Sequence, residues 1–146
     1  MSFPNFTDAG DLPGGIYRAS LNDVIQHFGA GSARRRQVSQ RLERIAKIAF
    51  DTEKVVHFVI FGSFVTNKPE PNDVDIFMIM EGDFDASTLT SEAQILFDHL
   101  SCQAYFGASV FWLRRMTAWG GEQAAIEDWQ IKRDGDKRGI VEVIHD

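Results

Sequence analysis

The alternation of hydrophobic and polar positions divides the chain into segments with helical or strand spacing. Over residues 32–51, Val38, Leu42, Ile45 and Ala49 recur every three or four positions, which predicts an amphipathic helix with one buried stripe. Their regular spacing makes this the clearest helix in the chain. Shorter helices are predicted at residues 21–28, 87–101 and 124–129.

Other apolar runs have the length of strands. Residues 55–61 are apolar at nearly every position, which is typical of a central strand covered on both faces. In residues 73–80, Val74, Ile76, Met78 and Met80 share one face, because side chains two positions apart point the same way. Further strands are predicted at residues 103–113 and, at an edge of the sheet, 139–144, whereas residues 1–15 form an irregular leader.

The length of 146 residues suits one domain with a substantial hydrophobic core. Helices and strands alternate along most of the chain, which indicates a sheet with helices packed against it. We therefore expect a single α/β (α+β) domain over residues 1–146, with a mixed sheet of four to five strands flanked by helices.

Asp73 and Asp75 open the second central strand. Because they are two positions apart, both carboxylates face one way, with Cα atoms roughly 7 Å apart. Two acids on one face repel each other, and burial of either is costly without a partner. A hard cation such as Mg²⁺ removes that cost and prefers oxygen ligands. We interpret the pair as a metal site; the alternative is that Asp73 caps a turn and Asp75 pairs with a lysine.

The turn between the two central strands contains a second candidate group. Gly62 would let the backbone approach a triphosphate closely, and the Ser63 hydroxyl and backbone N–H groups would donate to its oxygens. Lys68 could add a positive charge near the same phosphates. The alternatives are an ordinary turn and a solvated lysine, but the acids that follow favour nucleotide binding.

The spacing of Gly62-Ser63, nine residues and then Asp73-x-Asp75 resembles the signature of the nucleotidyltransferase superfamily, which has a polymerase-β-like fold. The resemblance extends from about Leu12 to Val143 and is to a bacterial branch of minimal members. It implies Asp73 and Asp75 as catalytic metal ligands for Mg²⁺ or Mn²⁺, and Gly62, Ser63 and Lys68 as the nucleotide-binding residues.

The implied activity is transfer of a nucleoside monophosphate from an NTP to a hydroxyl group, with release of pyrophosphate. The acceptor would be a protein, an RNA or a small molecule. Related minimal proteins include toxin–antitoxin and phage-defence components, so a protein acceptor is included among the candidates.

One position departs from that family pattern. Active superfamily members carry a third carboxylate on a neighbouring strand, where it serves as metal ligand and general base. The matching position here is Ala108 or Ser109, and we choose Ser109. A serine hydroxyl is a poor base, and loss of a general base typically costs 10²–10⁴-fold in rate. The alternative function is therefore a catalytically impaired nucleotide-binding or antitoxin-like interaction module.

Composition and charge limit the partners and the cellular location that we expect. Fifteen basic and 21 acidic residues give a net charge of −6, which argues against broad nonspecific DNA binding. We interpret the basic cluster at residues 34–36 as a solvated helix start, the alternative being contact with phosphates or a partner. We interpret the cluster at residues 132–138 as a solvated, charged hairpin tip, the alternative being that it lines a nucleic-acid or phosphate groove. Cys102 is the single cysteine, so no disulfide forms within the chain. Without a signal pattern or a membrane-length apolar run, we expect a cytoplasmic protein with no membrane partner.

Overall fold

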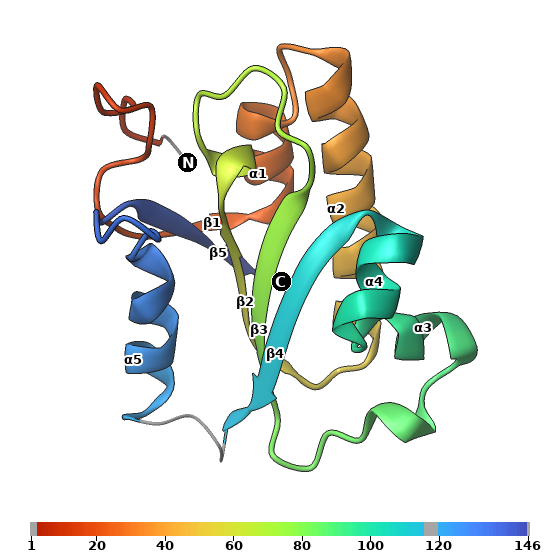
Figure 1. Cartoon of the computed structure of the whole chain (residues 1–146). Helices are drawn as coiled ribbons and strands as arrows, with labels where there is room; N and C mark the ends of the chain where they lie inside the picture. Colours follow the sequence, from red (N-terminus) through yellow and green to blue (C-terminus); the bar gives the residue numbers. More distant parts are fainter. Residues whose placement is uncertain (1–2, 116–119, 146) are drawn as a thin grey trace.

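The computed structural model describes residues 3–115 and 120–145, which form a five-stranded mixed sheet with helices on both faces (Figure 1). The order of the strands across the sheet is β1-β5-β2-β3-β4. β1 runs parallel to β5 and β3 parallel to β4, whereas β2 is antiparallel to both of its neighbours. The expected mixed sheet is confirmed. The strands are β1 (Gly15–Ser20), β2 (Val55–Phe61), β3 (Val74–Met80), β4 (Ala108–Arg114) and β5 (Gly139–Ile144).

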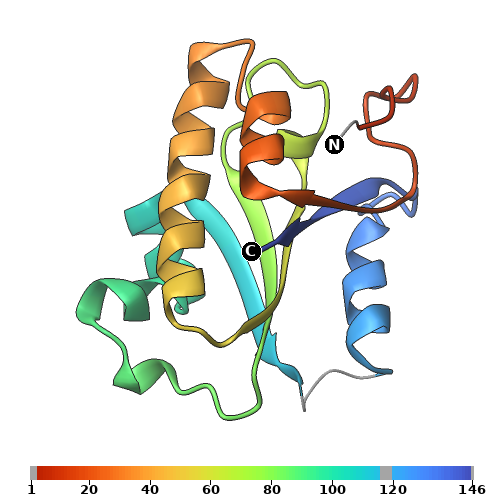
Figure 2. The same ribbon diagram turned by 180° about the vertical axis from the view of Figure 1, so that it is seen from behind.

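The helices divide unequally between the two faces of the sheet (Figures 1 and 2). The helices between residues 21 and 106 lie on one face, and α5 (Glu122–Glu127) lies on the other, where it packs against the middle strands. Among the described residues the helices are α1 (Leu21–Phe28), α2 (Ala33–Asp51), α3 (Ser91–Leu96), α4 (His99–Phe106) and α5 (Glu122–Glu127), with short 3-10 turns at Ser63–Val65, Ala86–Thr88 and Asp128–Gln130.

The two faces of β3 lie in different hydrophobic clusters. The larger cluster lies under α1 to α4 and contains the face that the sequence predicts, Val74, Ile76, Met78 and Met80. It also contains the predicted stripe of α2, all four residues of which are fully buried. The smaller cluster joins Phe77 and Ile79 to Ile126 of α5. Asp75 belongs to this second face and lies near the start of β3, where the cover of apolar side chains stops.

The segment before β4 differs from the prediction. The expected helix at residues 87–101 is interrupted near Phe97, and the expected strand at 103–113 begins only at Ala108. Asp98 starts the second helix, because its side chain accepts a hydrogen bond from Ser101 N at 3.1 Å. Gly107 ends that helix in the left-handed conformation, at φ +66°. Local caps therefore determine this break rather than the apolar pattern.

The two ends of the sequence meet in the sheet. β1 was not predicted, and β5 lies between β1 and β2 rather than at an edge as expected. The two strands pair in register from Gly15 opposite Gly139 to Ser20 opposite Ile144. The predicted leader contains no helix or strand at residues 3–14, although Asp11 forms an isolated bridge with Thr66. Its first two residues lie outside the described part of the chain.

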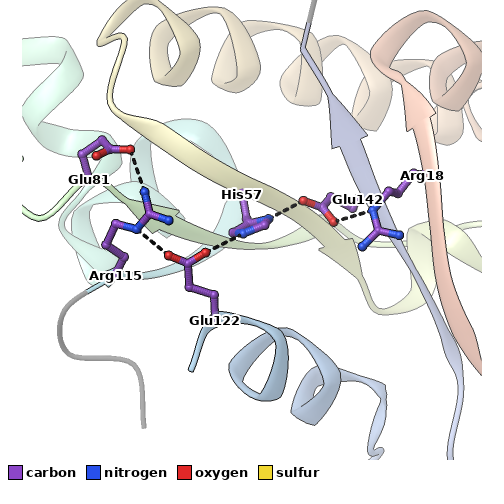
Figure 3. Close-up of polar contacts among 6 residues, drawn as sticks. All are labelled: Arg18, His57, Glu81, Arg115, Glu122 and Glu142. Atoms are coloured by element: carbon purple, nitrogen blue, oxygen red, sulfur yellow. Dashed lines mark hydrogen bonds and ion pairs between the residues drawn. The ribbon is translucent and has the colours of Figure 1, made fainter. Parts of the chain in front are cut away.

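A row of ionic side chains connects the second face of the sheet to α5 (Figure 3). His57 of β2 lies between two carboxylates, with Nδ1 bonded to Glu142 of β5 and Nε2 to Glu122 of α5 at 3.0 Å. Arg18 of β1 extends the row beyond Glu142, and Arg115 extends it beyond Glu122 to Glu81. Both ring nitrogens of His57 therefore have partners within the protein. No helix in the described residues is long and apolar enough to cross a membrane.

Candidate functional site

The aspartate pair lies where β3 meets β2 and β4. Asp73 immediately precedes β3, and Asp75 pairs with Phe61 of β2 on one side and with Ser109 of β4 on the other. The Ser109 hydroxyl donates to Asp73 Oδ2 at 3.4 Å. Asp73, Asp75 and the predicted third position therefore occupy one corner of the sheet.

Gly62 lies against the second aspartate. It adopts φ +81°, which L side chains rarely adopt, and a Cβ atom there would lie 2.0 Å from Asp75 Oδ2. Only glycine lets the backbone pass this close to the carboxylate. Ser63 begins the 3-10 turn that follows, and its carbonyl accepts hydrogen bonds from Thr66 N and Oγ1. Gly62 thus lies beside the acids, with Ser63 next to it in the chain.

Burial and charge disfavour the ionised form of Asp75. Burial, followed by the neighbouring negative charge of Asp73, raises the pKa of this carboxyl from its usual value of 3.8 to about 6. The positive charge of Arg138 and a hydrogen bond from Ser109 oppose the rise in pKa. A cation bound next to Asp75 would lower the free-energy cost of ionising this carboxyl.

Lys68 does not lie with these residues. It is an exposed residue of the loop before β3 and is not among the residues that line the cleft beside Asp75. Its backbone N–H donates to Thr66 Oγ1 at 3.2 Å, and its carbonyl accepts from Arg35. The structure therefore brings Gly62, Asp73 and Asp75 together and leaves the Lys68 side chain outside the group.

A cleft of about 690 Å³ opens beside Asp75 and Ser109. Small-molecule sites commonly have volumes of this size. Three aromatic rings line one part, and the Trp129 ring centroid lies 4.4 Å from that of Phe61 and 5.2 Å from that of Phe111. The cleft therefore combines an acidic end with an aromatic wall whose rings are tilted against one another.

Three cations also line this cleft: Lys132, Arg133 and Arg138. They belong to the segment between the last 3-10 turn and β5, which the sequence analysis interpreted as a solvated cluster. That interpretation is wrong for Arg138, which is partly buried with its guanidinium 5.6 Å from the Phe61 ring centroid. Sequence reasoning identified these cations but had no signal that would place them beside the aspartates.

A larger hollow of about 880 Å³ lies elsewhere, at the end of β5 near His145. Its charged lining includes Arg18 and Glu142, which already form the ionic row with His57. The cleft at the aspartate pair is smaller but contains more groups suited to a ligand, and we take it as the candidate site.

Arg35 supports the loop that carries Gly62 and the aspartates. This residue of α2 is only 7% exposed, and its guanidinium donates to the backbone carbonyls of Phe28, Phe64, Thr66 and Lys68. The prediction of a solvated cluster at residues 34–36 is therefore wrong for its central member. Since the guanidinium replaces water on four carbonyls, it fixes the path of the loop between β2 and β3.

Comparison with protein families identifies the family of this chain. The model of a family of unknown function, DUF6932, matches residues 4–144. The chain belongs to DUF6932. No curated protein and no solved structure gave a match. The matched span of the DUF6932 chain runs from before β1 to the end of β5, so it includes both the aspartate pair and the cationic segment.

The acids of the DUF6932 chain suit a hard cation that shares its coordination with a ligand. Within the described residues, no group of three or more histidine, cysteine, aspartate or glutamate side chains is arranged to hold a metal ion. Mg²⁺, however, is commonly held by one or two carboxylates together with substrate phosphates. The paired oxygens of Asp73 and Asp75, and the cost of ionising Asp75, fit that kind of site.

Proposed function

We propose that this protein is a nucleotidyltransferase-like protein that binds a nucleoside triphosphate with Mg²⁺ or Mn²⁺ and transfers its nucleoside monophosphate to a hydroxyl group. One observation carries the proposal. Asp75, two positions after Asp73, lines a cleft of about 690 Å³ that also presents cations and aromatic rings. Phosphoryl-transfer sites depend on such positioning and neutralisation of charge.

Each residue of the candidate site would have its own role in binding the nucleotide and the metal ion. Asp73 and Asp75 would hold the divalent ion, which when bound neutralises phosphate charge. Gly62 leaves room beside Asp75, and the adjoining backbone N–H groups could donate to phosphate oxygens. The rings of Phe111 and Trp129 offer an apolar aromatic surface, and a nucleobase could stack on one of them. Lys68 remains a candidate only if its loop moves toward the cleft.

A second candidate function is nucleotide binding without transfer. It is favoured by Ser109, which pairs directly with Asp75 at the position where a third acid is expected. Its hydroxyl already donates to Asp73 and ionises too poorly to serve as a base. The protein would then act as a nucleotide sensor or as an antitoxin-like partner of another protein.

Label transfer distinguishes the two functions. The protein is incubated with each α-³²P-labelled NTP, Mg²⁺ or Mn²⁺ and a cell lysate, beside the Asp73→Ala/Asp75→Ala double variant. Transfer of label by the wild type that disappears in the variant supports the enzyme. Metal-dependent NTP binding without transfer supports the sensor. Absence of NTP binding in the wild type would refute both.

The chain offers a matched control. Asp83 and Asp85 have the same spacing as the site acids but lie in the exposed loop after β3, where Asp83 pairs with Lys54 and Asp85 caps a 3-10 turn. The Asp83→Ala/Asp85→Ala variant removes the same number of charges away from the cleft. It should bind and transfer as the wild type does, and an equal loss in both double variants would count against the assigned site.

A further inference from the structure

Arg138 occupies a fixed position beside the aspartate pair. Its backbone N–H donates to Gln130 O at 2.8 Å, and the N–H of the next residue, Gly139, donates to Leu12 O at 2.8 Å. The side chain lies over the Phe61 ring and lines the same cleft as Asp75. Arg138, immediately before β5, therefore places a guanidinium beside Asp75. It belongs to a part of the chain that lies outside the Gly-Ser and Asp-x-Asp motif.

The guanidinium is only partly satisfied by the protein. Its Nε atom is buried, and within the described residues that atom has no hydrogen-bond partner. Its neighbour Lys132 differs, because the ammonium group already pairs with Asp11 at 3.0 Å. A buried donor without an acceptor costs free energy, and a bound anion would remove that cost. Arg138 is thus the cation of the cleft that is best prepared to receive a ligand oxygen.

The chemistry of the side chain indicates the ligand group. A guanidinium presents its donors in a planar fork that matches two oxygens of one phosphate. The ring of Phe61 lies on one side of it, which restricts its orientation and its hydration. Phosphate is also the group that a divalent ion at Asp73 and Asp75 would share. A phosphate chain between the acids and Arg138 would therefore be bound from both ends.

We propose that Arg138 binds a phosphate group of the ligand, so that the residue just before β5 adds an anion-binding group to the cleft that Asp75 also lines. This inference rests on the proposed function in taking a nucleotide as the natural ligand. It goes beyond the motif residues, because it makes the residue just before the C-terminal strand part of the recognition surface.

The test measures how tightly the full chain binds inorganic pyrophosphate in excess EDTA. Binding is monitored by ³¹P NMR as the protein is titrated with pyrophosphate. Arg138→Gln should weaken binding about tenfold or more, since it removes the charge and the fork. Arg138→Lys should recover only part of the affinity, because a lysine keeps the charge but not the paired donors. Lys137→Gln removes an exposed cation next to Arg138 that does not line the cleft, and should bind within about twofold of the wild type.

A second background separates direct contact from an effect through Asp75. In Asp73→Ala/Asp75→Ala, metal-free pyrophosphate binding should be unchanged or tighter, because two negative charges are gone. Arg138→Gln should still weaken it there. If Arg138 only neutralised the acids, the substitution would have no effect in this background, and the inference would be overturned. Equal binding by the wild type and Arg138→Gln, or no pyrophosphate binding by a folded wild type, would also overturn it.

Failure of the proposed function gives a different result. In that case Arg138-dependent pyrophosphate binding persists in EDTA, but Mg²⁺ does not tighten NTP binding and the aspartate double variant behaves as the wild type. Thermal unfolding of each variant, recorded in parallel, identifies any loss of binding that is caused by misfolding.

Discussion

Replacement of Asp75 by asparagine should stabilise the folded protein at neutral pH. Burial and the nearby Asp73 charge raise the pKa of Asp75 from 3.8 to about 6, so its ionised form is disfavoured in the native state. Each unit of difference between the folded and unfolded pKa of Asp75 corresponds to about 1.4 kcal/mol. The ionised Asp75 carboxyl therefore destabilises the folded state by at most about 3 kcal/mol. Because the carboxyl lines an open cleft, we expect a gain of about 1–2 kcal/mol in the free energy of unfolding.

The sign of the pH dependence follows from linkage. Between pH 3.8 and about 6 the folded state binds more protons at Asp75 than the unfolded state does. The contribution of this group to stability is therefore most favourable below pH 3.8 and decreases as the pH rises through 6. The advantage of Asp75→Asn should be complete at pH 7.5, about half as large near pH 5 and small near pH 4.

Urea denaturation followed by circular dichroism at pH 4, 5, 6 and 7.5 measures this difference. Asp73→Asn is the control, because it removes the neighbouring charge but not the burial of Asp75, which is the larger cause of the raised pKa. It should stabilise the protein less. Added Mg²⁺ should stabilise the wild type but not Asp75→Asn. A variant no more stable than the wild type at pH 7.5, or a gain that does not shrink toward pH 4, would refute the reasoning.

Further substitutions test other parts of the structure. Arg35→Met should cost about 3 kcal/mol in urea denaturation, since it leaves buried carbonyls without a donor; a loss below about 1 kcal/mol would contradict the role given to this guanidinium. His57→Ala should cost about 2 kcal/mol because Glu142, which is 8% exposed, loses one of its two partners and keeps only Arg18, and combining it with Glu142→Gln should recover part of the loss. For comparison, Asp51→Asn breaks an exposed pair with Lys47 and should change stability by less than about 0.5 kcal/mol. Ser109→Asp should increase label transfer if the missing third acid limits the reaction, and unchanged transfer would mean that the missing acid is not the limitation.

The parts of the fold that were predicted correctly depend on local pattern. The stripe of α2 and the alternation of β3 record burial directly, because each residue's neighbours along the chain determine its face. The strand at residues 55–61 follows from the same rule. The break before β4 was missed because the apolar content of residues 99–106 suits a helix or a strand equally well. The Asp98 cap and the left-handed Gly107 were the signals that could have decided it.

The parts that were missed depend on distant partners. β1 is short and mostly half-buried, and it becomes a strand by pairing with β5 more than a hundred residues away. The role of Arg35 depends on four carbonyls from two separate stretches of chain, which charge alone does not indicate. The same applies to Arg138, whose place beside Asp75 exists only once β5 has entered the sheet.

The pairing of β1 with β5 has a consequence for biosynthesis. The ribosome delivers residues 139–144 after every other strand, so β2 keeps an open edge toward β5 until then. A nascent chain can form the β2–β3–β4 part of the sheet with its aspartates, yet it lacks the guanidinium and the inserted strand. The proposed phosphate contact of Arg138 would therefore form only after the segment that contains Arg138 and β5 has been synthesised and has entered the sheet.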